Sequence, residues 1–358
     1  MNYTYKQIWL INFPVMMSIL MEQLINITDA VFLGHVGEIE LGASAIAGIY
    51  YLAVYMLGFG FSIGLQVMIA RKNGEQDYQE TGKIFFQGLL FLMGLALFLY
   101  LTVHIVSPVI FKRSINSPEI YQAIIRYLDW RSLGLLFSFP FLAIRSFLVG
   151  ITYTRALSGA AIVAIGINIP LNYFLIFMQH LGISGAAIAS SLAEGGSFIT
   201  LCIYMWIKTD KIKYGLRTVY DGQLLIAVLK LSVWSMSHAF ISVAPWFLFF
   251  VAIEHLGKTE LAISNITRSV SAIFFVIANS FAVTTGSLVS NAIGAGARKE
   301  LFPICHKVLK LGYAVGFPLV VVALLCNRWI VSFYTDNELL VELAFAPFVV
   351  MLLNYTFA

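Results

Sequence analysis

Ten apolar runs, each long enough to cross a lipid bilayer as a helix, make up most of this sequence. A hydrocarbon core about 30 Å thick requires roughly 20 residues of α-helix, because each helical residue rises about 1.5 Å. The runs do not alternate apolar with polar residues, as transmembrane barrel strands do. The sequence therefore predicts an all-α polytopic membrane protein. The expected spans are residues 8–33, 41–70, 84–111, 120–150, 157–178, 186–207, 224–253, 261–292, 304–333 and 339–358.

The composition excludes the main soluble classes. Hydrophobic residues make up 60% of the 358 residues, charged residues only 11%, and the mean hydropathy is +0.87. A soluble domain carries about 25% charged residues. The net charge of +4 comes from basic residues in short connections, so it bears on membrane topology and does not indicate a nucleic-acid partner.

No catalytic or metal-binding motif stands out. The three cysteines are scattered singly, and the sequence contains no Cys-x-x-Cys, Gly-x-Ser-x-Gly, His-Glu-x-x-His or phosphate-loop pattern. We therefore expect no enzyme, no structural metal and no cofactor. Without a nucleotide site, uphill work would have to come from an ion gradient.

The positions of lysine and arginine predict the orientation in the membrane. Taking the amino terminus and every even-numbered connection as one side, that side holds 15 of the 22 basic residues, Arg145 among them; the other holds 7, including Arg131. Cytoplasmic connections carry the excess of Lys and Arg. We therefore expect a cytoplasmic amino terminus in the inner (plasma) membrane. The first run contains acids and lacks a cleavage site, which predicts a membrane helix and not a signal peptide.

The chain contains an internal repeat. A shift of 220 residues superimposes its halves without a gap, and matches the pattern H-x-G-x-x-E-L-x-x-S in both. An even number of spans per repeat gives parallel repeats related by an axis along the membrane normal. We expect an amino-terminal six-helix bundle (1–207), a cytoplasmic linker (208–222) and an incomplete second bundle (223–358). The matched pairs include His35 with His255, Gly37 with Gly257, Glu40 with Glu260, Ser44 with Ser264 and Gly74 with Gly294.

The repeat also bears on the carboxyl end of the chain. The offset relates Ala358 to Ser138, which lies inside the fourth span and not after it. We therefore expect six plus at least four transmembrane helices here, and twelve in a full-length protein. The alternative is a natural ten-span protein.

A polar stripe on the first span suggests a functional site. Ser18, Glu22, Asn26 and Asp29 follow one another at steps of four, four and three, so they share one helix face. A carboxylate at the bilayer centre costs roughly 2.5 to 3.5 kcal/mol on insertion scales, so it should face a cavity or carry a proton. Glu22 and Asp29 are therefore functional candidates. The alternative is that each reaches an interface or a basic partner.

Two further spans carry polar groups. Asn168 and Asn172 lie one turn apart around Pro170, and Ser190 and Glu194 lie one turn apart in the sixth span. These groups would supply oxygen ligands and titratable groups suited to a proton or Na⁺. The alternatives are that the amides and hydroxyl bind helices together and that Glu194 forms an ion pair within the bundle.

These features resemble the multidrug and toxic compound extrusion (MATE) family, which belongs to a larger group that also contains polysaccharide and lipid flippases. The segments that carry the resemblance are FPVMMSILMEQLINITDAVFLGHVGEIELGA, NIPLNYFLIFMQHLGISGAAIASS, WFLFFVAIEHLGKTELAISNITRS and SLVSNAIGAGARKE. The resemblance implies two six-helix bundles around a V-shaped cavity that opens alternately to each side.

The resemblance also implies roles for particular residues. In the DinF-like branch, an acid in the first helix, an N-x-x-x-D pair in the fifth and a hydroxyl in the sixth form a cation or proton site. Asp29, Asn168 and Ser190 match these positions, whereas Asn172 stands where that branch has Asp. Glu22 or Glu194 could then replace the lost titratable group. Pro14 matches a proline proposed to bend the first helix. The acid that NorM-type members carry in the seventh helix is absent.

The resemblance and the buried acids together predict a secondary antiporter. It would export amphipathic, cationic organic compounds (drugs or toxins) in exchange for H⁺ or Na⁺, acting as a monomer in the lipid bilayer. One alternative is a lipid-linked oligosaccharide flippase of the same architecture, which would favour a strongly basic cavity. A third is a membrane scaffold or sensor that transports nothing, which has no need of buried acids.

Overall fold

The computed structural model describes residues 3–115, 117–216, 220–254, 258–332, 342 and 345–354, and over these residues the structure is helical, without strands. This confirms the all-α fold expected from the sequence. The elements are α1 (Tyr5–Gly34), α2 (Glu38–Gly74), α3 (Tyr78–Ser114), α4 (Pro118–Arg131), η1 (Ser132–Gly134), α5 (Leu135–Gly150), α6 (Arg155–Tyr173), η2 (Phe174–Met178), α7 (Gly182–Lys208), α8 (Gly222–Glu254), α9 (Lys258–Gly294), η3 (Arg298–Glu300), α10 (Leu301–Leu325), α11 (Asn327–Ser332) and α13 (Phe345–Asn354).

Within the described residues, nine helices are long and apolar enough to cross a membrane, and they correspond to the first nine expected spans. Of the tenth, the structure describes residues 342 and 345–354, which include α13; the others lie outside the described residues. The helices begin earlier than the apolar runs because polar residues cap them. Thr4 and Gln7 form a capping box at the start of α1, and the Asp77 carboxylate accepts a hydrogen bond from the Glu80 N–H at the start of α3.

Two expected spans are helices with a local irregularity. The fourth consists of α4 and α5 joined by the 3-10 turn η1, and the fifth ends in the single π-helical turn η2. Pro170 precedes that turn and cannot donate a backbone hydrogen bond within α6. Such turns often occur at functional sites, and both turns here adjoin the residues described below.

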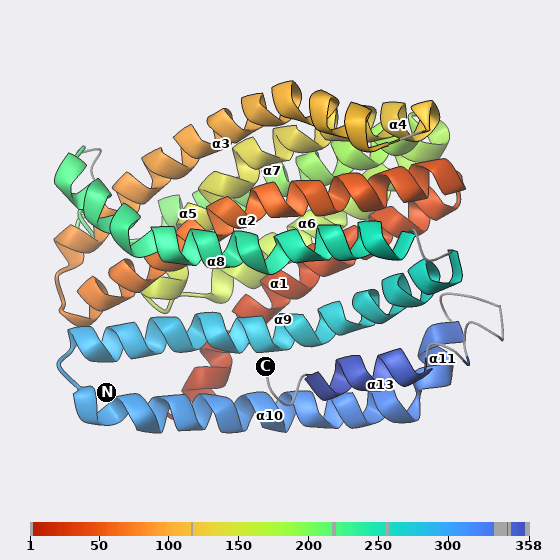
Figure 1. Cartoon of the computed structure of the whole chain (residues 1–358). Helices are drawn as coiled ribbons and strands as arrows, with labels where there is room; N and C mark the ends of the chain where they lie inside the picture. Colours follow the sequence, from red (N-terminus) through yellow and green to blue (C-terminus); the bar gives the residue numbers. More distant parts are fainter. Residues whose placement is uncertain are drawn as a thin grey trace.

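Helices from the two halves pack directly on one another. In Figure 1, α2 and α8 lie side by side, α9 and α10 run together along one edge, and α3 and α4 lie along the opposite edge. The contacts between halves are reciprocal under the 220-residue offset. The Thr284 hydroxyl donates to Asn12 Oδ1 at 2.9 Å, and the residues related to this pair, Gly64 and Ser232, are also in close contact.

The same reciprocity holds where α2 crosses α9. Gly74 packs against the backbone of Asn291, and Gly294 packs against the backbone of Arg71. The offset relates Gly74 to Gly294 and Arg71 to Asn291, so the two contacts are equivalent halves of one crossing. A Cβ atom at either glycine would meet backbone atoms of the other helix. The division of the chain into two bundles remains a prediction, which this crossing favours.

The connection expected to be a linker packs on the first half of the chain. The Gln79 side-chain amide donates to the Ile212 carbonyl at 2.8 Å, and the ring of Tyr214 packs against those of Tyr78 and Phe147. Residues 217–219 of this connection lie outside the described residues, as do His255 and Gly257 of the repeat motif.

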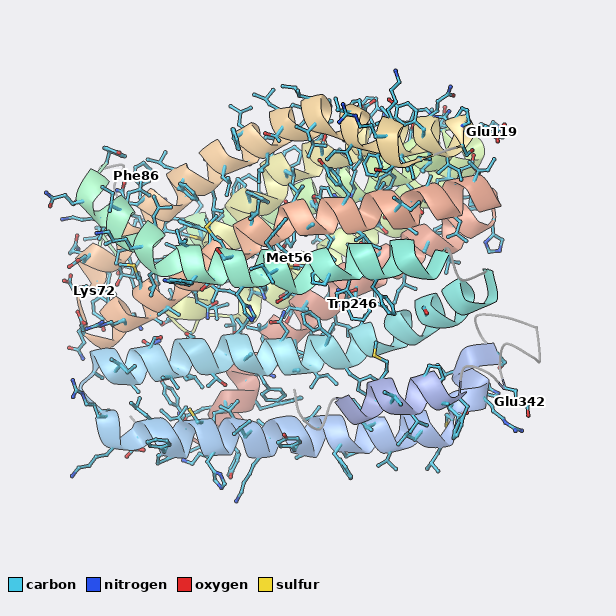
Figure 2. All side chains as sticks on the ribbon, in the orientation of Figure 1. Met56, Lys72, Phe86, Glu119, Trp246 and Glu342 are labelled. Atoms are coloured by element: carbon cyan, nitrogen blue, oxygen red, sulfur yellow. The ribbon has the colours of Figure 1, made fainter. Side chains whose placement is uncertain are left out.

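Two arginines counted as topology signals are buried in helices. Arg131 is 7% exposed and Arg145 is 4% exposed, so neither belongs to a connection. Without these two arginines, the side of the amino terminus holds 14 basic residues and not 15, and the other side holds 6 and not 7. The orientation expected from the sequence is therefore unchanged. Figure 2 shows Lys72 and Glu119 at opposite ends of the bundle, as expected of residues separated in the sequence by one span, 84–111.

We expect Gly294→Ala to lower the free energy of unfolding by about 1 to 3 kcal/mol, because the added methyl group must push α9 away from α2. The measurement is unfolding of the purified protein in mixed detergent micelles. Gly286→Ala on the same helix is the matched control, since nothing lies within 4 Å of a Cβ atom built there. Equal stability of the two variants would contradict the close crossing.

Candidate functional site

The Asp29 carboxylate is buried and surrounded by hydrogen-bond donors. The side-chain amide of Asn172 donates to Asp29 Oδ1 at 2.6 Å, and that of Asn168 donates to the same oxygen at 3.3 Å. The Ser190 hydroxyl donates to Asp29 Oδ2. Asp29 is 5% exposed and Ser190 1%, while both asparagines are fully buried. These four side chains, the Asp29 cluster, satisfy a carboxylate that would otherwise be costly to bury.

Three helices supply the Asp29 cluster. Asp29 lies in the last two turns of α1, and Ser190 lies in the first half of α7. The spacing of Asn168 and Asn172 puts both amides on one face of α6, directly before the π-helical turn η2. Both α6 and α7 pack on α1, which brings the three helices into contact at this point.

The amides in the Asp29 cluster leave one acceptor unused. Asn172 donates to Asn168 Oδ1 at 3.1 Å as well as to Asp29, but its own Oδ1 is buried and accepts no hydrogen bond in the part of the chain that the structure describes. Next to a carboxylate, a free amide oxygen is a suitable acceptor for a proton carried by Asp29, or a ligand for a hard cation. Among the described residues, no group of three or more His, Cys, Asp or Glu side chains is placed to hold a metal.

A second buried cluster joins α7 to α2 and α4. Arg131 Nη2 of α4 lies 2.6 Å from Glu194 Oε1 of α7, and Arg131 Nη1 donates to the Tyr51 hydroxyl of α2 at 3.1 Å. The guanidinium also lies over the Tyr51 ring, 4.0 Å from its centroid. Gly134, in the turn η1, packs against Arg131 and Glu194, and a Cβ atom there would collide with both. We call Arg131, Glu194 and Tyr51 the Arg131 cluster.

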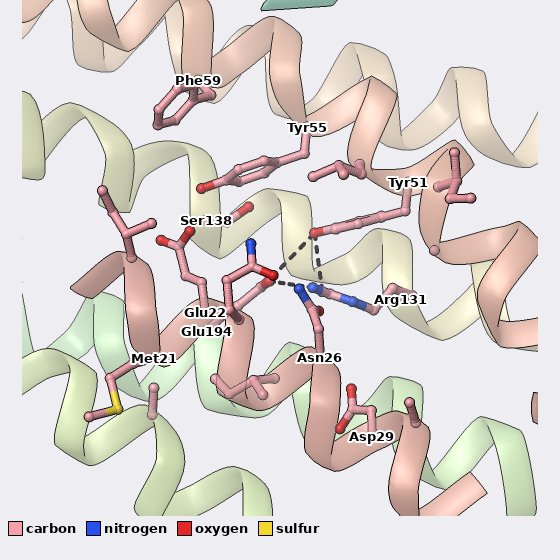
Figure 3. Close-up of a pocket in the computed structure, with 18 of the residues that line it drawn as sticks. Met21, Glu22, Asn26, Asp29, Tyr51, Tyr55, Phe59, Arg131, Ser138 and Glu194 are labelled. Carbon is pink, nitrogen blue, oxygen red and sulfur yellow. Dashed lines mark hydrogen bonds and ion pairs between the residues drawn. The ribbon is translucent and has the colours of Figure 1, made fainter. Parts of the chain in front are cut away.

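Both clusters border one cavity of about 300 Å³. Its wall includes the whole polar stripe of α1, namely Ser18, Glu22, Asn26 and Asp29, and Phe275 and Asn279 of α9 contribute from the second half of the chain. Figure 3 shows Glu22 at the left and Asp29 near the bottom of the close-up, with Tyr51 and Arg131 at the right. The remaining wall is mostly aromatic and aliphatic. Its aromatic members are Tyr51, Tyr55, Phe59, Tyr127, Phe141 and Phe275.

The structure brings together four of the residues singled out from the sequence, Asp29, Asn168, Asn172 and Ser190. Glu22 and Glu194 line the same cavity without contacting the Asp29 carboxylate, and Glu194 forms the ion pair considered as its alternative. Pro14 is buried within a continuous α1. The roles of these residues are not tested by their positions and stay predictions.

Sequence reasoning missed two residues of the wall. Arg131 was counted among the basic residues that set the topology, although it lies inside the fourth expected span, residues 120–150. Tyr51 was not distinguished from the other aromatic residues of the spans. A basic residue and an acid in separate spans could have suggested an ion pair, but not which acid is the partner.

Comparison with known proteins agrees with the fold. The family model described as MatE matches residues 14–174 and 236–358. Mouse multidrug and toxin extrusion protein 1 is 27% identical over 319 residues, covering 84% of this chain and 55% of that protein. A probable multidrug resistance protein NorM from Idiomarina loihiensis is 23% identical, covering 92% of this chain and 73% of that protein. The chain thus spans just over half the length of the mouse relative.

Solved structures with the same fold are MATE and related transporters. The eukaryotic MATE transporter AtDTX14 superimposes with a TM-score of 0.89 at 18% identity, covering 98% of this chain and 79% of that one. A MOP superfamily transporter from Pyrococcus furiosus gives 0.85 at 18% identity, covering 97% and 77%. The fold is therefore the one that these transporters share, and members of the MATE family are transporters and not enzymes. The family model covers most of the sequence, and the chain belongs to the MatE family.

We expect Arg131→Met to lower the free energy of unfolding by about 3 kcal/mol, because it leaves the Glu194 carboxylate without its counter-ion. This loss lies at the lower end of the range usual for breaking a buried ion pair, because the Glu194 side chain is 21% exposed. In the double variant Arg131→Met/Glu194→Met no charge is left unpaired, so the loss should be smaller than the sum of the two single losses. Unfolding in mixed micelles gives all three values, and strictly additive losses would contradict the pairing.

Proposed function

We propose that the chain acts as a secondary antiporter that exports amphipathic, cationic organic compounds in exchange for H⁺ or Na⁺. The observation that carries the proposal is the Asp29 cluster, a single buried carboxylate with a free acceptor oxygen beside it, at the wall of a cavity large enough for a small organic molecule. The mouse relative is named a multidrug and toxin extrusion protein, and the Idiomarina relative a probable multidrug resistance protein.

The charge of the cavity wall favours cationic substrates. Its titratable side chains include three carboxylates, Glu22, Asp29 and Glu194, against one guanidinium, Arg131. A lipid-linked oligosaccharide carries phosphate, so a flippase would need the opposite balance, and a scaffold would need no buried acid. These alternatives therefore gain no support from the described residues.

In this mechanism, ion binding at Asp29 and substrate binding in the cavity favour opposite openings. With Asp29 ionised, the cavity attracts the organic cation; an incoming H⁺ or Na⁺ neutralises Asp29 and the substrate is released. Coupling requires that each ligand binds the two conformations with different affinity. Pro14 would serve as the point where α1 bends when Asp29 is neutralised, since no backbone hydrogen bond is available there. The proposal includes a cytoplasmic amino terminus, a DinF-like type of ion site and a monomeric unit.

We expect Asp29→Asn to abolish gradient-driven export while the protein still inserts and folds, because the amide keeps the shape but cannot take up a charge-balancing cation. The measurement is accumulation of a fluorescent organic cation in proteoliposomes with an imposed pH gradient, and separately with an imposed Na⁺ gradient. The gradient that drives accumulation by the unmodified protein identifies the coupling ion.

Asp129→Asn is the matched control, since this side chain is 51% exposed and lies outside the cavity. It should export at the unmodified rate. Export by Asp29→Asn at the unmodified rate would refute a coupling role for Asp29.

A further inference from the structure

Of the three carboxylates on the cavity wall, two are engaged by protein groups. Asp29 accepts hydrogen bonds from three side chains, and Glu194 is paired with Arg131 and in contact with the Tyr51 hydroxyl. Glu22 forms no hydrogen bond and no ion pair with any residue in the part of the chain that the structure describes. A carboxylate in a membrane-spanning helix that has no internal partner carries a proton, faces water in a cavity or binds a cation from outside, and Glu22 lies on the cavity wall.

The surroundings of Glu22 suit the cationic end of an aromatic molecule. Tyr55, Phe59 and Phe141 line the same cavity, and Figure 3 shows the Glu22 side chain on the same side of it as Tyr55 and Ser138. The Ser138 hydroxyl is buried beside the Tyr51 hydroxyl, which Arg131 and Glu194 also engage. Aromatic faces attract organic cations, most strongly where water is displaced.

We propose that Glu22 binds the positively charged group of the substrate in this aromatic part of the cavity, the Glu22 subsite, while Asp29 is reserved for the coupling ion. The inference rests on the proposed function and deepens it. The substrates expected at the Glu22 subsite are flat aromatic cations with one delocalised or quaternary positive charge.

The charged neighbours of Glu22 define how the Glu22 subsite would work. They are Arg145 on α5, Arg131 on α4 and Glu194 on α7. Arg131 and Glu194 neutralise each other. Arg145 packs over Phe59, with its guanidinium carbon 5.6 Å from the ring centroid, and its Nε and Nη2 have no hydrogen-bond partner among the described residues. No ion pair joins Arg145 to Glu22 there, so Arg145 balances one negative charge at a distance.

With Glu22, Asp29 and Glu194 all ionised, the two guanidinium groups of Arg131 and Arg145 leave one negative charge at the site. One univalent cation therefore neutralises the site, either at Asp29 or at Glu22. The two residues are seven positions apart on α1, or about 10 Å along the axis. At an effective dielectric constant of about 20, a charge at one position changes the affinity of the other roughly tenfold. Substrate and coupling ion would then compete electrostatically without sharing ligands.

The test is equilibrium binding to the purified protein in lipid nanodiscs, without any gradient. The probes are 10-methylacridinium, a permanent cation, and 10-methylacridone, a neutral ring system of similar shape, both followed by fluorescence. We expect Glu22→Gln to weaken binding of the cation roughly tenfold and of the neutral probe less than twofold. Glu22→Asp, which keeps the charge, should retain the preference, and Glu119→Gln, an exposed acid on α4, should bind both probes as the unmodified protein does.

Equal weakening of both probes by Glu22→Gln would overturn the inference, because it would mean that Glu22 shapes the cavity, for example through Arg145. Unchanged binding of both probes would overturn it as well. Failure of the proposed function looks different: the cation would still bind in a Glu22-dependent way, but neither gradient would drive its export. Gradient-driven export together with charge-independent binding would reject the Glu22 subsite alone.

Discussion

The packing of the first bundle depends on how it accommodates an acidic side chain buried within the membrane. Removing a carboxylate from water costs several kcal/mol unless hydrogen bonds replace its hydration. Asp29 receives such bonds from three side chains on two other helices. These bonds fix how α1, α6 and α7 meet. The chemistry of the Asp29 cluster and the packing of the first bundle are therefore one constraint, and moving α1 relative to α6 would weaken the hydrogen bonds.

The contacts between the halves are of another kind. Where α2 crosses α9, two glycines let the backbones approach, and Asn291 donates to the Gly150 carbonyl at 2.9 Å. Close approach through small residues together with side-chain-to-backbone hydrogen bonds is a usual way to join helices in a bilayer, where lipid is as apolar as the side chains. The reciprocity of the contacts follows from the internal repeat. The proposed alternating opening would use such an interface, because two similar halves can pack in related ways.

The sequence predicts much of this structure because the signals are local. Span number follows from run length, and the common face of Asn168 and Asn172 follows from a spacing of four. The grouping of Asp29 with Asn168 and Ser190 needed the family resemblance, since periodicity alone says only that each lies on a polar face. The pairing of Arg131 with Glu194 was not predictable, because it joins residues 63 positions apart whose helices meet only in the folded bundle. The interruptions η1 and η2 also depend on tertiary packing, and no run-length argument could place them.

The amide at position 172 changes what the Asp29 cluster can do. An aspartate there would place two carboxylates together, and like charges at this distance disfavour double ionisation. Asn172 instead donates to Asp29, and its own Oδ1 accepts no hydrogen bond from any residue that the structure describes, so the cluster holds a single titratable carboxylate. One carboxylate can be neutralised by one univalent cation. Under the proposed function, a second charge that selects a cationic substrate comes from elsewhere on the wall, and because Glu194 is paired with Arg131, the remaining acid among the described wall residues is Glu22.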